Sequence, residues 1–258
     1  MSDEVVRERH GAVLVVRINR PEVRNAIDSA VMAGVGAAVL DAEADPGLRA
    51  LVLTGTGERA FCAGEDLRAF AGGGPLGAAV DEHRRDAFVR LIHGRVAVPV
   101  VGAANGTAVG GGLELLLGCD VVVASSEAKF GLPEVQRGLF PGGSGVYLGT
   151  RLPLAVALEL ALTGDSIDAE RAHALGLVNR VVPPADVLDA ALALAGRIAA
   201  NGPLAVAATK ELLRLAVTDP ARVPARLQAL LPVVFGSEDA REGAAAFVGR
   251  RPPVWKGR

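Results

Sequence analysis

The first half of the chain alternates short apolar runs with segments of helical periodicity. Four aliphatic runs predict strands, at residues 13–19, 50–54, 98–103 and 121–124. After the first run, Asp28 can cap a helix that places Val31 and Val35 on one face. Because apolar strands separated by helices are typical of parallel sheets, this half predicts a parallel sheet buried on both faces.

The second half of the chain is predicted to be mostly helical. Periodic segments punctuated by glycines cover residues 155–162, 168–175, 185–199, 204–217, 222–230 and 238–248. Residues 177–182 predict one short strand, and the Gly-rich residues 72–75 predict a flexible loop. We therefore expect an α/β core over residues 1–195 and a helical C-terminal region over residues 196–258.

Composition and charge narrow the class of protein. The 258 residues are 50% hydrophobic, and 29 acidic against 27 basic residues leave a formal charge of −2. This balance argues against a nucleic-acid-binding face, which usually shows a basic excess. The first twelve residues are charged and lack an apolar stretch, so no signal peptide is expected, and no long uncharged apolar run predicts a membrane span. Cys62 and Cys119 form neither a disulfide framework nor a zinc cluster, so a reduced cytoplasmic setting without a bound metal is expected.

One Gly-rich stretch has a pattern that presents backbone N–H groups. In NGTAVGGGLEL, residues 105–115, an apolar strand precedes three glycines and a predicted helix at residues 111–117. The first N–H groups of a helix have no internal acceptor, and the helix dipole favours negative charge there. An anion or a developing oxyanion would suit this position, although tight packing of the turn explains the glycines equally well. The GxGxxG spacing of dinucleotide sites and the Gly-Lys-Ser/Thr of phosphate loops are both absent.

Two glutamates stand in apolar surroundings. Glu114 lies three residues into the predicted helix, and Glu134 follows Pro133 in the sequence FGLPE. Each alone fits the start of an ordinary helix. Together, poorly solvated carboxyls can hold a water between them, and burial with mutual repulsion would raise the pKa of at least one. One could then serve as a general base and the other as a general acid.

The order of these motifs resembles the crotonase superfamily, which comprises enoyl-CoA hydratases and isomerases. The resemblance covers nearly the whole chain, from Asn19-Arg20-Pro21 with Asn25-Ala26 to the tail PVWKGR at residues 253–258. Between them lie FCAGEDL, NGTAVGGGLEL, FGLPE, LTG, ALGLVN and SED, at residues 61–67, 105–115, 130–134, 162–164, 174–179 and 237–239. The resemblance implies a ββα spiral core with a helical C-terminal region that builds homotrimers, often hexamers as dimers of trimers.

Family membership would also imply a chemistry. Members bind acyl-CoA thioesters, in which coenzyme A is part of the substrate and no metal or redox cofactor is expected. Two backbone N–H groups polarise the thioester carbonyl and stabilise an enolate; here they map to Glu65 and Gly111. The two glutamates that flank the water in hydratases map to Glu114 and Glu134. The resemblance therefore implies a lyase, a trans-2-enoyl-CoA hydratase, with Glu114 activating water and Glu134 protonating the α-carbon.

Several alternatives stay open at this stage. A Δ3,Δ2-enoyl-CoA isomerase would need only one glutamate, and a carnitinyl-CoA-type hydratase, a branched acyl-CoA hydrolase and a non-catalytic CoA- or RNA-binding relative are further candidates. The sequence GGSGVY at residues 142–147 departs from the GAGGTQR of many hydratases, which leaves the acyl group open. The resemblance implies substrate contacts at Arg24, Ala26, Ala63, Gly64, Asp66, Leu67, Arg68, Gly110 and Gly142. Arg24 could meet the CoA phosphates or simply face solvent, and solvent is favoured for Lys256 and Arg258.

Overall fold

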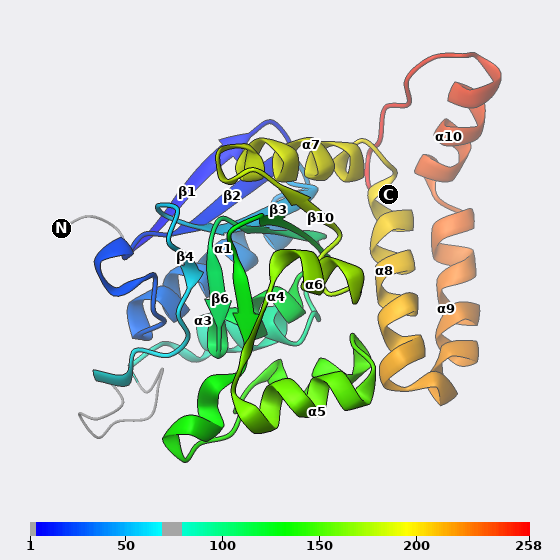
Figure 1. Ribbon diagram of the computed structural model, residues 1–258. Helices are drawn as coiled ribbons and strands as arrows, with labels where there is room; N and C mark the ends of the chain where they lie inside the picture. Colours follow the sequence, from blue (N-terminus) through cyan, green and yellow to red (C-terminus); the bar gives the residue numbers. More distant parts are fainter. Residues whose placement is uncertain (1–3, 69–78) are drawn as a thin grey trace.

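The four aliphatic runs lie in one six-stranded sheet of the computed structural model, which describes residues 4–68 and 79–258 (Figure 1). Its strands, in spatial order, are β1 (Val5–His10), β2 (Val13–Ile18), β3 (Ala50–Gly55), β5 (Val100–Ala104), β7 (Val121–Ser125) and β10 (Arg180–Val182). All neighbours pair in parallel except β1, which is antiparallel to β2. The expected parallel sheet is confirmed. The loop expected at residues 72–75 lies outside the described residues.

The edge strand β1 was missed by the sequence interpretation. Its residues VVRERH are half-buried or exposed, so no apolar run marks it. It pairs with β2 through a tight turn in which Gly11 has a φ of 60°. Charged side chains are common on edge strands, because they discourage pairing with a further strand. A polar edge strand therefore carries little of the hydrophobic pattern on which the prediction depends.

A second, smaller sheet lies beside the first. It contains β4 (Ala60–Cys62), β6 (Thr107–Val109), β8 (Lys129–Gly131) and β9 (Ser166–Asp168). Along the chain, β3, β5 and β7 join the large sheet while β4, β6 and β8 join the small one. Each turn of chain thus adds one strand to each sheet, which is the expected spiral. Strands of three residues are too short to show a period, which is why the sequence did not reveal them.

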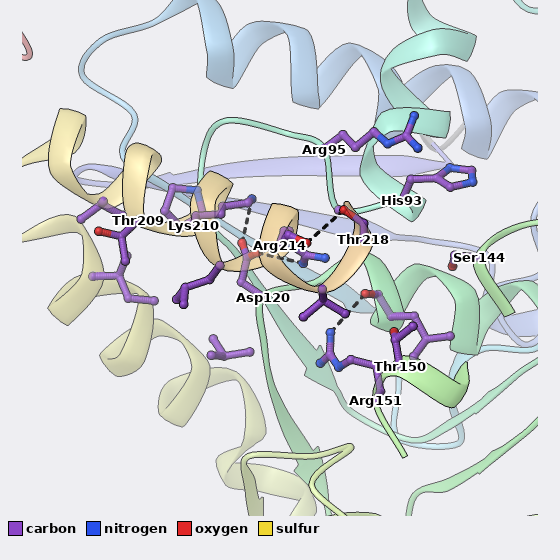
Figure 2. A pocket seen from close by; sticks show the side chains of 18 of the residues that line it. His93, Arg95, Asp120, Ser144, Thr150, Arg151, Thr209, Lys210, Arg214 and Thr218 are labelled. Carbon is purple, nitrogen blue, oxygen red and sulfur yellow. Dashed lines mark hydrogen bonds and ion pairs between the residues drawn. The ribbon is translucent and has the colours of Figure 1, made fainter. Parts of the chain in front are cut away.

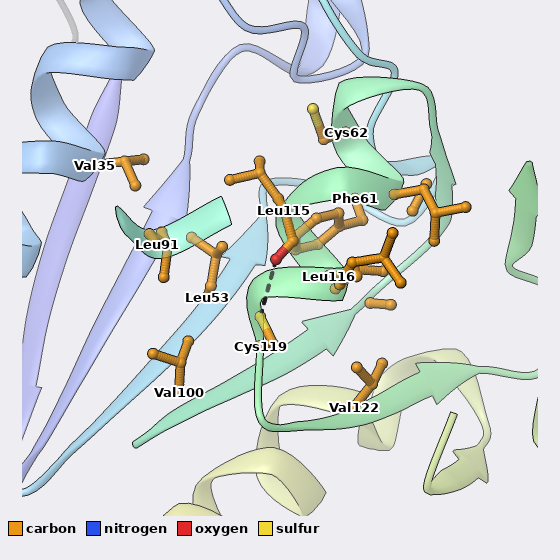
Figure 3. Close-up of a cluster of buried hydrophobic side chains, with 14 of the residues drawn as sticks. Val35, Leu53, Phe61, Cys62, Leu91, Val100, Leu115, Leu116, Cys119 and Val122 are labelled. Carbon is orange, nitrogen blue, oxygen red and sulfur yellow. Dashed lines mark hydrogen bonds between the residues drawn. The ribbon is translucent and has the colours of Figure 1, made fainter. Parts of the chain in front are cut away.

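Helices cover both faces of the large sheet. Helix α7 (Val187–Ala199) packs on the face formed by Val15, Val52 and Val101. The opposite face meets helices α1 (Ser29–Ala44), α3 (Glu82–Ile92) and α4 (Gly111–Gly118). Figure 3 shows part of this second cluster, where Val35, Leu53, Leu91, Val100, Leu115 and Leu116 meet. Alternate residues of each strand point to opposite faces, so both faces must be apolar.

The remaining helices follow the predicted order. They are α5 (Leu154–Thr163), α6 (Ala169–Ala174), α8 (Pro203–Thr218), α9 (Val223–Phe235) and α10 (Glu238–Val248). Short 3-10 segments are η1 (Pro21–Val23), η2 (Pro133–Arg137), η3 (Ser144–Thr150), η4 (Pro184–Asp186) and η5 (Pro220–Arg222). The strand expected at residues 177–182 shortens to β10, because the N–H groups of Leu177 and Val178 both donate to the carbonyl of Ala172.

The expected boundary after residue 195 falls within α7. Ala199 still packs on the sheet, and the chain turns by 107° between this helix and α8. Beyond the turn, α8, α9 and α10 stand to one side of the core (Figure 1). The division into two domains stays a prediction. In the described part of the chain, no single helix is long and apolar enough to cross a bilayer, although the bent α7–α8 pair passes that test when taken together.

The α1–α3 contact provides a test of the fold. A Cβ on Gly36 of α1 would lie 2.0 Å from the carbonyl oxygen of Arg84 on α3, whereas a Cβ on Gly196 of α7 would meet nothing within 4 Å. We expect Gly36→Ala to lower the free energy of unfolding by roughly 1–3 kcal/mol through overpacking. Gly196→Ala should raise it by about 0.5–1 kcal/mol, because alanine loses less entropy in a helix. Urea denaturation measures both; an unchanged Gly36→Ala variant would contradict the close contact.

Candidate active site

The N-terminus of α4 lies against the chain segment that follows β4. A Cβ on Gly112 would lie 2.1 Å from the carbonyl oxygen of Cys62, and one on Gly64 would lie 3.2 Å from the nitrogen of Gly111. Gly64 and Gly110 also have positive φ angles, of 91° and 56°. Side chains at Gly64 and Gly112 would force the two backbones apart, and a side chain at Gly110 would strain its own backbone. The glycines of both motifs therefore permit one close approach.

This approach brings together the N–H groups of Glu65 and Gly111. The position of a Cβ on Gly111 lies 3.6 Å from the Glu65 nitrogen. A parallel bridge to Ile27 occupies the Gly64 carbonyl and the Asp66 N–H, at 2.8 Å each, and leaves the Glu65 N–H out. Within the described residues, neither the Glu65 nor the Gly111 N–H donates to a protein acceptor. Two such donors at a helix N-terminus can stabilise an oxyanion; that role stays a prediction.

Glu114 is held at one oxygen and open at the other. Its side chain is buried, and Oε1 accepts hydrogen bonds from the N–H groups of Gly143 at 2.8 Å and Gly145 at 2.9 Å. The Ser144 hydroxyl donates to the carbonyl of Glu114 at 2.9 Å. These two N–H groups hold Oε1 in place. Oε2 has no hydrogen bond in the described part of the chain, so it can take a water molecule.

Glu134 reaches the same helix end from η2. Its Oε1 lies 3.1 Å from the Cβ position of Gly110, the N-cap of α4. Its Oε2 is buried and has no hydrogen-bond partner among the described residues. Burial raises the pKa of Glu134; its own backbone N–H and Arg137 oppose the rise, and the charge of Glu114 adds to it. Burial and the charge of Glu114 therefore both disfavour the ionised form of Glu134.

The two carboxyls thus differ in the way that acid–base chemistry needs. Glu114 accepts two N–H bonds and suits a base, whereas Glu134, whose Oε2 has no hydrogen-bond partner among the described residues, suits an acid. Both stand beside the paired N–H groups of Glu65 and Gly111. The site can add the elements of water across a double bond conjugated to a carbonyl, or move a proton along such a system.

The side chain of Glu65 adds a third carboxyl to the site. From the sequence, only the backbone N–H of Glu65 was expected to take part. Its side chain is half-buried, and burial raises its pKa, with a further rise from the charge of Glu114. In the described part of the chain its carboxyl has no ion pair. The position of Glu65 directly after the Ala-Gly of FCAGEDL could have suggested a carboxyl at the site, but the direction of the side chain depends on the fold.

The other expected contacts fall into two groups. Ala26, Ala63, Gly64 and Gly110 are gathered around the helix end, and the Ala63 N–H donates to the Arg24 carbonyl at 3.0 Å. Arg24, Leu67, Arg68 and Gly142 are exposed. Lys256 and Arg258 are exposed, and both pair with Glu238. Roles for these residues in substrate binding stay predictions.

Asp66 has a structural partner that the sequence did not suggest. Its carboxylate pairs with Arg20 at 3.2 Å, and Arg20 also pairs with Asp28 at 3.2 Å and donates to the Ala26 carbonyl at 2.8 Å. Asn25, whose φ is positive, donates to the carbonyls of Thr56 and Ala60. The NRP and NA motifs therefore hold the loop that carries Ala26 beside Glu65.

The two cysteine side chains are free thiols buried in the core. Burial raises the pKa of both Cys62 and Cys119 to about 12, so neither thiol is a ready nucleophile. No group of three or more His, Cys, Asp or Glu side chains within the described ranges could hold a metal ion. The expectation that the chain uses no cofactor stays a prediction.

A cavity of about 930 Å³ lies at the other end of α4. Its walls come from α8, from the end of α3 and from η3, and they include Arg95, Asp120, Arg151, Lys210 and Arg214 (Figure 2). Ser144 lines it as well, but none of Glu65, Gly111, Glu114 and Glu134 does. The cavity is therefore separate from the paired carboxyls.

Comparisons with known proteins agree with this arrangement. A family model described as enoyl-CoA hydratase/isomerase matches residues 8–258. The carnitinyl-CoA dehydratase of Proteus mirabilis is 39% identical over the full length of both chains. The crystal structure of an enoyl-CoA hydratase from Mycobacterium tuberculosis covers both chains fully, with 45% identity and a TM-score of 0.92. That of a carnitinyl-CoA hydratase from Mycobacterium avium also covers both fully, with 43% identity and a TM-score of 0.79.

The burial of Glu134 predicts a pH-dependent effect on stability. Because its folded-state pKa is raised, protonation stabilises the fold, and this stabilisation is lost as the pH rises through the folded pKa. We expect Glu134→Gln to raise Tm at pH 8 and to have little effect below the unfolded pKa of about 4.3. Calorimetric scans across pH 4–8 measure the difference. Exposed Glu127→Gln is the control, and an equal effect of Glu134→Gln at every pH would contradict the argument.

Proposed function

The chain belongs to the enoyl-CoA hydratase/isomerase family, the crotonase family, and we propose that it reversibly adds water to a trans-2-enoyl-CoA to give a 3-hydroxyacyl-CoA. The observation that carries the proposal is the pairing of two carboxyls in different environments at one helix end. Glu114 accepts two N–H bonds, and Glu134 has a buried oxygen without a partner among the described residues. Hydration needs a base and an acid on one substrate, whereas isomerisation can use a single carboxyl.

The paired N–H groups would act on the thioester. The Glu65 and Gly111 N–H groups donate to the thioester oxygen and stabilise the negative charge that forms there. One good donor of this kind contributes roughly 3–4 kcal/mol to the stability of the transition state. The dipole of α4 acts in the same direction. The conjugated double bond is thereby polarised, which makes the β-carbon electrophilic.

The two glutamates would then deliver the elements of water. Glu114 Oε2 orients a water molecule and takes one of its protons while the oxygen forms a bond to the β-carbon. The electron pair of the double bond moves to form the enolate, and protonated Glu134 donates its proton to the α-carbon. The product carries one new O–H group and one new C–H bond, and proton transfer between the glutamates restores the starting state. Such a pair titrates as a unit.

Assembly and location belong to the same proposal. Large apolar side chains are exposed on the C-terminal helices, among them Leu213, Val217, Phe235 at 76% and Phe247 at 87%. Apolar exposure of this kind supports a self-association surface. We propose a homotrimer, or a hexamer made of two trimers. We still expect the enzyme to be cytoplasmic. We also expect it to have no nucleic-acid or membrane partner.

A second candidate is a hydratase for a cationic acyl-CoA, as in carnitinyl-CoA. Glu65 favours it, because its side chain adds a third carboxyl beside Glu114 and has no ion pair in the described part of the chain. A quaternary ammonium on the acyl group would find negative charge there. The relatives named carnitinyl-CoA dehydratase and carnitinyl-CoA hydratase support the same candidate.

Loss of the enone absorbance of crotonyl-CoA and longer trans-2-enoyl-CoAs tests the hydratase proposal. We expect turnover by the wild type and a fall in kcat of about 100-fold or more in both Glu114→Gln and Glu134→Gln, since each removes one proton-transfer group. Glu127→Gln, on an exposed turn, should turn over normally. No hydration at any chain length would refute the proposal. Retained activity on 3-enoyl-CoAs in one variant would favour isomerisation.

The role of the Glu65 carboxyl can be separated from that of its N–H. Glu65→Gln keeps the backbone donor and removes the charge. For crotonobetainyl-CoA we expect kcat/KM to fall about tenfold, equivalent to roughly 1.4 kcal/mol of lost attraction, a modest part of what two charges gain at close range. The value for uncharged crotonyl-CoA should change less than about threefold. Equal losses for both substrates would show that the charge does not select the acyl group.

A further inference from the structure

Arg214 of α8 contacts the far end of the helix that carries the paired carboxyl and N–H groups. Its Nη2 donates to the carbonyls of Gly118 at 2.9 Å and Cys119 at 3.0 Å, the last residue and the C-cap of α4. Arg214 lies 94 residues or more from these partners in the sequence. The last carbonyls of a helix have no internal donor and carry partial negative charge. A guanidinium is the side chain best suited to bind them.

The position of the guanidinium is built into the fold. A Cβ on Gly94 would lie 1.9 Å from Arg214 Nη1, so the chain after α3 leaves room for the guanidinium only with glycine there. Arg214 Nε and Nη2 also donate to Asp120 Oδ1, at 3.0 and 2.9 Å. Figure 2 shows the Arg214 and Lys210 side chains converging on Asp120 at the wall of the cavity. All three side chains are largely buried.

Asp120 connects this helix end to the large sheet. Its Oδ2 accepts from the Val100 N–H at 2.8 Å, at the start of β5, and pairs with Lys210 at 2.8 Å. Lys210 also donates to the carbonyl of Val98 at 2.9 Å. Helix α8, the sheet and the C-terminus of α4 are therefore joined at one buried point. Lys210 contacts the sheet side of this point, whereas Arg214 contacts α4 itself.

Helix α4 is short, so a contact at its C-terminus also affects the position of its N-terminus at the active site. The helix has eight residues, about 12 Å along its axis, with Gly111 at its start and Glu114 one turn later. The buried leucines of α4 fix its rotation against the core. The contact at its C-terminus opposes sliding along the axis. A displacement of even 1 Å at a reacting group can cost about 100-fold in rate.

We propose that Arg214 is a positioning residue that sets the place of the Gly111 N–H and of Glu114 by holding the C-terminus of α4. The C-terminal helices thus contribute to the rate of reaction as well as to assembly. The inference rests on the proposed function, because it assigns Arg214 an effect on the same N–H groups. It requires no contact between Arg214 and the substrate.

Two readouts together test the proposal. The first is kcat and KM for crotonyl-CoA, or for crotonobetainyl-CoA if only that substrate is hydrated. The second is the absorption maximum of bound 4-(dimethylamino)cinnamoyl-CoA, which shifts to the red as its carbonyl is polarised. We expect Arg214→Met to lower kcat at least tenfold with KM changed less than about threefold, and to reduce the red shift of the saturated complex. Arg214→Lys should restore part of both, since one ammonium can still reach a helix carbonyl.

The control variant is Arg226→Met, which removes an exposed ion pair between α9 and Glu211 of α8 without touching α4. It should leave both readouts unchanged. Lys210 still neutralises Asp120 in the Arg214→Met variant. If Arg214→Met does not fold, the two readouts of Arg214→Lys test the inference instead. A folded Arg214 variant with normal kcat and a full red shift would overturn the inference. A wild type with neither turnover nor red shift would refute the proposed function, and the inference would fall with it.

Discussion

The contact between the N-terminus of α4 and the segment after β4 is a backbone-to-backbone approach that side chains would prevent. At Gly112 a Cβ would lie 2.1 Å from the Cys62 carbonyl oxygen, and at Gly64 it would crowd the nitrogen of Gly111. This approach places two N–H groups side by side and aims the start of a helix dipole at the space in front of them. The glutamates, the glycine loop at residues 142–145 and the loop held by Arg20 all lie around this contact.

Around this contact, the carboxyl groups of Glu114 and Glu134 lie in different surroundings. At Glu114, the Gly143 and Gly145 N–H groups donate hydrogen bonds to one carboxyl oxygen. Within the described residues, the buried Oε2 of Glu134 has no hydrogen-bond donor, and burial raises the pKa of Glu134. An unpartnered buried carboxyl costs stability, and it is tolerated here beside the groups that would use its proton.

The architecture explains how such a site stays in place. Each turn of the spiral supplies one strand to each sheet, so β4, β6 and β8 bring three separate motifs to neighbouring positions. The buried point formed by Asp120, Lys210 and Arg214 then joins the C-terminal helices to the opposite end of α4. The helical region is therefore connected to the site by specific hydrogen bonds, although α8 lies beside the core (Figure 1).

Much of this organisation could be predicted from the sequence, because local patterns carry it. Aliphatic runs specify β2, β3, β5 and β7, and the order of FCAGEDL, NGTAVGGGLEL and FGLPE indicates the family. Patterns of this kind could not reveal β1, which is a polar edge strand, or β4, β6 and β8, which are three residues long. Tertiary structure alone decided that Glu134 meets Gly110, that Asp66 pairs with Arg20 and that Arg214 reaches Gly118. The physical reason is that periodicity and glycine content are properties of neighbouring residues, whereas burial, charge pairing and protonation depend on which distant segments pack together.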